Sequence, residues 1–381
     1  MDIRTSLVLS LVSSLQIYQQ SILSTLSTIY TPFEYATISS SFPFGKFLST
    51  LTLCFKPKPP LPLLVLDAYL LIVGGIVSSF TAWPLVALGR LCLGLGAGIG
   101  FVCAPTVLYS CVPYSERPAH FFVLGISFAF ATLIANAVSL LPSAYMVLYA
   151  SSLVAILSGG LYICLQPRDD DLIDSIDNDL QETCVSTKPA FLCYTLMALN
   201  ACSGVPLYLS FASLFFKSFG ASTIAALSLS FAYPIIQIAL LLLVHTFAAS
   251  RKFLIVGGYA TVLMIQFLLL ITSSYPYLLH EQKTIAECVL FFILIVVVAV
   301  PANTSVCLIA EQFSSRSLQV IYSSRSRALM WLLSSISTFT FVLSMESCGF
   351  TQSFLPYFVT SALLYALLYY LYPQSGSDII L

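Results

Sequence analysis

Long apolar runs, separated by short polar stretches, follow one another along the whole chain. A helix that crosses the hydrocarbon core of a membrane needs about 20 mainly apolar residues. Runs of this kind predict twelve membrane-spanning helices in the 381 residues. The expected spans lie near residues 5–27, 33–54, 61–81, 84–112, 118–140, 142–165, 190–215, 221–247, 253–273, 285–310, 320–344 and 352–372.

The composition indicates a polytopic membrane protein, because 59% of the residues are hydrophobic and only 8% are charged. We expect the lipid bilayer as a partner and no nucleic acid, since no basic patch occurs. Loops of roughly three to seven residues separate most spans and leave no room for a soluble catalytic domain. Without an HExxH or GxSxG motif, we expect no enzyme. The eleven cysteines lack CxxC spacing, so we also expect no metal and no cofactor.

One long polar segment, residues 166–188, contains a run of acidic side chains and divides the spans six and six. A solvated cytoplasmic linker between two six-helix halves is the layout of transporters built from two parallel repeats. The sequence therefore predicts an all-α membrane fold with an N-terminal half (1–165), an acidic linker (166–188) and a C-terminal half (189–381). In such transporters the substrate binds near the midplane, between the halves.

Lysine and arginine in short loops predict the orientation, because cytoplasmic loops carry an excess of them. With the N-terminus inside, Lys217 and Lys283 fall outside, and an even number of spans places both termini in the cytoplasm. No retention or lipidation motif is evident, so the plasma membrane is the default location. The cytoplasmic side then carries Arg4, Lys56, Lys58, Arg117, Arg168, Lys188, Arg251, Lys252, Arg316, Arg325 and Arg327.

A distinctive stretch runs from Gly89 to Arg117, with alternate glycines from 94 to 100, a break at Pro105 and a charged corner at its end. Gly89-Arg90, Pro105, Pro113 and Arg117 have the spacing of the fourth helix of the sugar porter family, in the major facilitator superfamily. The chain resembles that family elsewhere too. The further similar segments are Ser14-Leu15-Gln16, LIAN at 133–136, Gln166-Pro167-Arg168, the helix 7 pattern from Asn200 to Gly220, and Pro301 with Ile309 to Phe313, Arg316 and Trp331.

The resemblance implies a transporter that moves a sugar by alternating access and works as a monomer. It also implies substrate-contacting positions that have changed in this chain. The family's helix 5 glutamine corresponds to Gly125, and its helix 10 tryptophan to Val306. The helix 7 glutamines correspond to Asn200 and Ala201, and the asparagine that follows them to Pro206. We therefore expect a hexose or a similar small polar solute, without assuming glucose.

Neutral amides are the expected substrate-binding groups, because they donate to and accept from hydroxyls without the desolvation cost of a fixed charge. Two polar pairs mirror each other in helices 1 and 7: Gln16 with Gln20, and Asn200 with Ser203. For single amides the alternative is a bond that ties helices together, which we favour for Asn136. The expected substrate-binding set is Gln16, Gln20, Asn136, Asn200, Ser203, Asn303 and Trp331, the last either stacking on a sugar ring or packing ordinarily.

Charged residues at the helix ends are the candidates for gating. Arg90 and Arg117 mark the outer and inner ends of the helix 4 stretch, and Glu116-Arg117 occupies the corner equivalent to Glu311 with Arg316. Such pairs would act as cytoplasmic latches in a rocking carrier. Plain solvation is the alternative, since exposed pairs contribute roughly 0–1 kcal/mol each. Ser110 stands where the family has a glutamate, which thins this network.

Energy coupling is predicted from the acidic residues in the spans. Proton-coupled members of the family carry an aspartate in helix 1, at the position of the Gln19-Gln20 pair here. Asp67 is the one remaining candidate for a proton site. The sequence thus favours a facilitative uniporter. The alternatives are a proton-coupled carrier of another solute, such as a nucleoside or organic ion, and a non-transporting sugar sensor.

Overall fold

The computed structural model describes residues 3–54, 60–111, 117–165, 187–246, 250–275, 277, 279–311 and 316–372, and nearly all of these are helical. The elements up to residue 165 are α1 (Ile3–Ser21), η1 (Ile22–Thr28), α2 (Pro32–Leu53), α3 (Pro60–Ser78), α4 (Trp83–Cys111), α5 (Arg117–Val138) and α6 (Ala144–Leu165). The later elements are α7 (Thr187–Cys202), α8 (Val205–Ser218), α9 (Thr223–Thr246), η3 (Phe253–Gly257), α10 (Gly258–Ser274), α11 (His280–Val297), α12 (Ala299–Glu311) and α13 (Arg316–Leu371).

Seven helical stretches among the described residues are long and apolar enough to cross a membrane. Two shorter apolar helices, Pro62–Ser78 and Phe122–Val138, accompany them. Many large apolar side chains on the outside of the bundle are at least half exposed, such as Leu157 and Phe191 at 60%. Apolar surface of this kind is stable against lipid hydrocarbon. The chain is therefore a multi-pass integral membrane protein.

Several expected spans are interrupted helices. The span near 190–215 breaks between α7 and α8, where Gly204 adopts φ 90° and Pro206 follows in the first turn of α8. The span near 285–310 is divided at Val298 into α11 and α12. The last two expected spans form one element, α13, which reverses at Gly349 with φ 76° and ψ 177°. Glycine is favoured at both positive-φ positions because it has no Cβ.

The glycine-rich stretch of α4 packs closely against its neighbours, as its small-residue spacing predicts. A Cβ on Gly96 would lie 2.6 Å from Oδ1 of Asp67 in α3, and one on Gly98 would lie 2.8 Å from the carbonyl oxygen of Lys46 in α2. The two glycines thus bring α3 and α2 close to different faces of α4, since neighbouring positions on a helix are about 100° apart.

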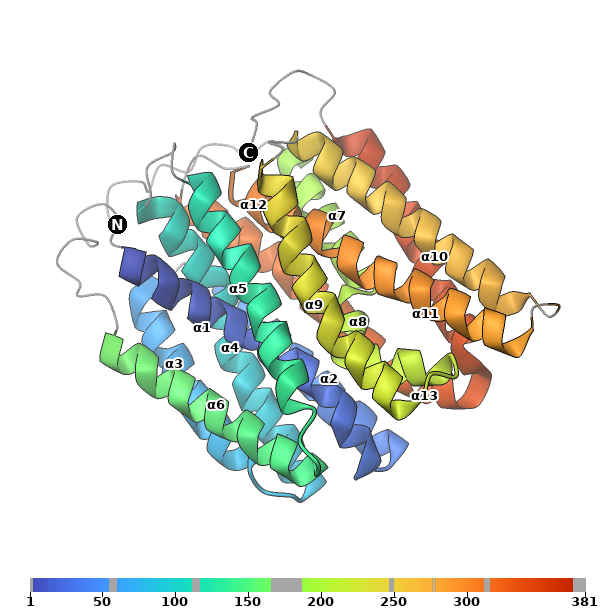
Figure 1. The fold of residues 1–381 in the computed structure, drawn as a ribbon. Coiled ribbons are helices and arrows are strands. Elements are labelled where there is room, and N and C mark those ends of the chain that lie inside the picture. The colour runs from blue at the N-terminus through green and yellow to red at the C-terminus, as the bar shows by residue number, and fades with distance from the viewer. Residues whose placement is uncertain are drawn as a thin grey trace.

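The helices form one bundle in which early and late parts of the chain lie side by side (Figure 1). Contacts between α2 and α13 and between α5 and α9 join these parts. The first helix begins and the last helix ends at the same end of the bundle (Figure 1). The expected linker at 166–188 lies almost wholly outside the described residues, so the division into two halves stays a prediction.

Candidate functional site

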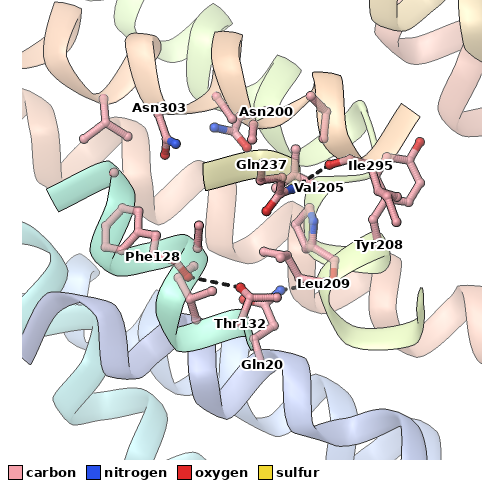
Figure 2. Close-up of a pocket in the computed structure, with 18 of the residues that line it drawn as sticks. Gln20, Phe128, Thr132, Asn200, Val205, Tyr208, Leu209, Gln237, Ile295 and Asn303 are labelled. Carbon is pink, nitrogen blue, oxygen red and sulfur yellow. Dashed lines mark hydrogen bonds between the residues drawn. The ribbon is translucent and has the colours of Figure 1, made fainter. Parts of the chain in front are cut away.

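A cavity of about 100 Å³ lies where helices from both parts of the chain meet. Pockets for small molecules typically measure about 300–1,000 Å³, so this space is small for a sugar. Most of the wall is apolar, and amide, hydroxyl and aromatic groups interrupt it at a few points (Figure 2). The principal lining residues are Ile17 and Gln20 (α1), Phe101 (α4), Gly125, Phe128 and Thr132 (α5), Asn200 (α7), Pro206 and Tyr208 (α8), Tyr233 and Gln237 (α9), Asn303 and Val306 (α12), and Met330 and Trp331 (α13).

Four amides face the cavity, and two of them are anchored to the backbone. Nε2 of Gln20 donates to the carbonyl oxygen of Pro206 at 3.1 Å, and Nε2 of Gln237 donates to that of Ile295 at 2.6 Å. Asn200 and Asn303 extend into the space from the opposite side to Gln20 (Figure 2). Neither asparagine side chain bonds to any residue that the structure describes. Their donors and acceptors are therefore available to a polar solute.

The structure places four of the seven expected binding residues on the cavity wall: Gln20, Asn200, Asn303 and Trp331. The other three are buried elsewhere. Nδ2 of Asn136 donates to the carbonyl oxygen of Ser230, which ties α5 to α9 as the helix-tying alternative predicts.

In each of the two polar pairs, one residue lines the cavity and the other does not. Gln16 is 1% exposed, and neither its amide oxygen nor its amide nitrogen has a hydrogen-bond partner. Ser203 lies at the break after α7, where its hydroxyl donates to the carbonyl oxygen of Asn200 at 3.1 Å. Its own carbonyl oxygen accepts from Gln266 at 2.8 Å. Ser203 keeps the helical register, since its N–H donates to the carbonyl oxygen of Leu199 at 2.8 Å, but it is buried and does not line the cavity.

Positions that the family resemblance implies as substrate contacts also meet here. Gly125, Asn200, Pro206 and Val306 all line the cavity, whereas Ala201 is buried in the core. A Cβ on Gly125 would lie 3.5 Å from Nδ2 of Asn303. The absence of a side chain at Gly125 therefore leaves this wall open next to the Asn303 amide.

Arg90 lies inside the bundle, at 3% exposure. Its Nη2 donates to the carbonyl oxygen of Gln19 at 2.8 Å, and it forms no ion pair with any residue that the structure describes. Among the other gating candidates, Arg117 begins α5, Glu311 ends α12 and Arg316 begins α13, while Glu116 lies outside the described residues. Their gating roles stay predictions.

Two cations beside the cavity were not expected to be buried. Lys46, in the middle of the apolar run of α2, is fully buried, and Arg327, counted above among the cytoplasmic arginines, is 1% exposed. The Lys46 ammonium lies 3.9 Å from the ring centroid of Trp331 and 4.3 Å from that of Phe42. The Arg327 guanidinium lies 4.4 Å from the Phe101 ring. For Lys46 the sequence did carry a signal, because a charge inside a span is costly and usually functional.

Asp67 is buried against α4. Its side chain is 1% exposed, and Oδ1 has no hydrogen-bond partner. It packs where Gly96 and Gly100 leave space for its carboxylate oxygens. The structure thus holds a carboxyl group in a membrane-spanning helix, away from the cavity wall.

No protein-family model and no curated protein matches the sequence. The fold is nevertheless similar to that of solved sugar transporters. A D-xylose-proton symporter matches with a TM-score of 0.75 at 14% identity, over 98% of each chain. The inward-open xylose transporter XylE from E. coli matches with a TM-score of 0.75 at 13% identity, over 98% of this chain and 97% of that one. XylE bound to 6-bromo-6-deoxy-D-glucose, described as a major facilitator superfamily proton:xylose symporter, gives 0.78 at 14%, over 97% and 96%.

These likenesses cover nearly the whole chain, so the chain has the major facilitator fold of membrane transporters. At 13–14% identity they establish the fold and leave the solute and its coupling open.

Proposed function

We propose that this protein transports a hexose or a similar small polar solute by alternating access, as a facilitative uniporter that works as a monomer without a cofactor. Twelve spans in two six-helix halves, 1–165 and 189–381, would rock about the central cavity. The observation that carries the proposal is the convergence of Gln20, Asn200, Gln237 and Asn303 from both parts of the chain on one largely apolar cavity.

Neutral groups suit a solute rich in hydroxyls. Each amide offers an acceptor oxygen and donor hydrogens. Because an amide is uncharged, its burial does not carry the desolvation cost of a fixed charge. Phe101, Phe128 and Trp331 supply aromatic faces for the apolar faces of a sugar ring. Because the cavity measures about 100 Å³, the helices around it must separate to admit such a solute.

A layer of aromatic rings divides the cavity from a larger recess of about 460 Å³, lined in part by Tyr35, Phe211, Phe215 and Phe341. Tyr208 lines the cavity, and Phe215 lines the recess with its ring centroid 6.0 Å from that of Tyr208. The Phe215 ring also stacks at 4.6 Å on Phe291. A movement of α8 about the break at Gly204 would part these rings and join the two spaces.

The surroundings of Arg90 support uniport. This arginine meets the backbone carbonyl of Gln19, and no carboxylate among the described residues pairs with it. The Gln19 amide is itself fixed to Ser151, with Nε2 donating to the carbonyl oxygen at 3.2 Å and Oε1 accepting from the hydroxyl at 3.0 Å. An amide does not titrate, so Gln19 cannot carry a proton during transport.

Asp67 favours the second candidate, a proton-coupled carrier. A buried carboxyl whose Oδ1 lacks a partner is the kind of group that carries protons in coupled transporters. The solved proteins of the same fold are described as proton symporters. This candidate differs from the first in one measurable property, its response to a pH gradient.

Uptake of labelled D-glucose and D-xylose into proteoliposomes tests both candidates. Saturable uptake that a protonophore leaves unchanged supports the uniporter. Accumulation that requires an imposed pH gradient, and that disappears in Asp67→Asn, supports the coupled carrier instead. Saturable binding without uptake of either sugar would indicate a sensor and would refute transport of these two sugars.

A further inference from the structure

Three cationic side chains are buried in one continuous group of aromatic rings next to the cavity. Arg90 and Lys46 flank the Phe42 ring, Lys46 also lies over Trp331, and Arg327 lies over Phe101. The rings of Phe101 and Trp331 contact each other, with centroids 5.7 Å apart. From this arrangement we propose that the transported solute carries a negative charge and that Lys46 is its counter-ion. The inference rests on the proposed transport function and specifies the solute class of the same cavity.

Lys46 differs from the two arginines in its hydrogen bonds. Arg90 donates to the carbonyl oxygen of Gln19, and Arg327 donates to that of Phe101. The Lys46 Nζ is fully buried and has no hydrogen-bond partner. An ammonium group has three donors and no acceptor, so all three donors remain available to an anion.

Lys46 contacts two aromatic rings, and these offset only part of the free-energy cost of burying its ammonium group. Cation–π contacts attract the ammonium without accepting its hydrogen bonds, and a charge in a membrane interior remains costly when its donors are unsatisfied. Charged groups are retained in spans mainly where function requires them. A solute anion would remove the cost by supplying the missing acceptor.

Asp67 does not supply that acceptor. Its oxygens occupy the space beside Gly96 and Gly100 of α4, whereas the Lys46 backbone packs against Gly98. Positions two apart on a helix point about 200° away from each other, so Asp67 and Lys46 meet different faces of α4. The carboxylate and the ammonium therefore belong to separate environments.

Trp331 connects Lys46 to the cavity, because the same side chain lines the cavity and lies under the ammonium. The indole Nε1 is also buried without a hydrogen-bond partner. A rotation of the Trp331 side chain, in a cavity that must widen for any solute, would bring the ammonium and the indole N–H to the solute. The carboxylate would then bind Lys46 while hydroxyls bind Asn200 and Asn303.

A sugar acid satisfies both requirements, with hydroxyls for the amides and one carboxylate for Lys46. D-glucuronate and D-glucose form a matched pair of probes, since they share the ring and differ at one carbon, which bears a carboxylate in the first and an alcohol in the second. L-lactate supplies an organic anion without the sugar ring. The three probes separate recognition of charge from recognition of the ring.

Trp331 is a built-in reporter, because the chain has two tryptophans and Trp83→Phe leaves only this one. In that background, reconstituted protein is titrated with each probe while Trp331 fluorescence is followed, and uptake of the same labelled compounds is measured in parallel. We expect saturable binding of glucuronate with a half-saturation at least about tenfold below that of glucose. Lys46→Met should abolish this preference, Lys46→Arg should retain part of it, and Lys283→Met should leave it unchanged.

The possible outcomes distinguish the charge inference from the role of Lys46 and from sugar transport itself. Glucose binding equal to or tighter than glucuronate binding in the Trp83→Phe protein overturns the charge inference and leaves sugar transport standing, without depending on the folding of any Lys46 variant. A glucuronate preference that persists in Lys46→Met overturns the role of this lysine. If lactate binds and neither sugar compound does, the result supports an anionic solute and contradicts recognition of a sugar ring. If none of the three probes binds and none is taken up, both proposals are refuted.

Discussion

The ammonium of Lys46 in α2 lies 3.9 Å from the ring centroid of Trp331 in α13, so a cation from the early part of the chain rests on an aromatic ring from the late part. The contact lies next to the cavity that Trp331 lines. It couples the packing of α2 and α13 to the space in which a solute would bind.

Substitution of Trp331 separates its packing role from its contact with Lys46. Trp331→Phe keeps an aromatic face, and Trp331→Leu removes it. We expect Trp331→Leu to unfold at lower temperature than Trp331→Phe, since a desolvated cation–π contact contributes about 2 kcal/mol. Thermal unfolding in nanodiscs measures the difference. If this difference in unfolding temperature disappears when Lys46→Met is combined with each variant, the contact with the Lys46 ammonium causes it. If the difference persists, it arises from packing.

The break at Gly204 requires glycine. Its φ of 90° and the Tyr208 ring, 2.5 Å from where a Cβ would lie, both oppose a side chain. We expect Gly204→Ala to destabilise the protein by about 1–2 kcal/mol and to slow transport. Gly160→Ala in α6 is the matched control, because nothing lies within 4 Å of its Cβ position. An equal effect of the two substitutions would contradict the role of the break.

The ring of Phe215 closes the cavity against the recess. Phe215→Leu removes the stacking on Phe291, which lies at 4.6 Å, and should make opening on that side less costly. We expect a cysteine placed at Asn303 to react faster with a membrane-impermeant thiol reagent in this variant, in a background without the other cysteines. Phe219→Leu is the control, since Phe219 belongs to the same cluster but lines neither space. Unchanged labelling would remove Phe215 from the barrier.

Asn200 and Asn136 are predicted to act differently. Asn200 faces the cavity without a hydrogen bond to a described residue, so Asn200→Ala should raise the half-saturation for solute and leave the melting temperature unchanged. Asn136 donates to Ser230, so Asn136→Ala should lower stability by roughly 0.5–1.5 kcal/mol and leave solute affinity unchanged. Uptake kinetics and thermal unfolding, measured on both variants, check the assignment. The reverse pattern would show that the cavity is misassigned.

Asp67 is not required for uniport. In Asp67→Asn the amide replaces a buried carboxyl that packs beside Gly96 and Gly100, and facilitated exchange of solute across the membrane should continue at a comparable rate. The measurement is counterflow of labelled solute without a pH gradient. Loss of counterflow in a variant that still folds would make Asp67 essential and would favour the proton-coupled alternative.

The sequence by itself determined the class of the protein. Apolar runs of membrane-spanning length and few charges require helices in lipid, because a backbone in hydrocarbon must satisfy its own hydrogen bonds. The alternate glycines of α4 predicted close packing, and the order of the family motifs predicted the fold that the solved transporters share. Asn200 and Gln20 were also identified as cavity residues from residue type and position alone.

Only the tertiary structure decided which polar groups share an environment. The i, i+4 spacing placed Gln16 beside Gln20 on one helix face, yet only Gln20 lines the cavity, because the helices that pack on α1 determine what each turn meets. Ser203, three residues after Asn200, is likewise buried away from the cavity that Asn200 lines. The meeting of Lys46 with Trp331 joins helices remote in the chain. Such contacts depend on how helices dock, and local periodicity carries no information about the partner helix.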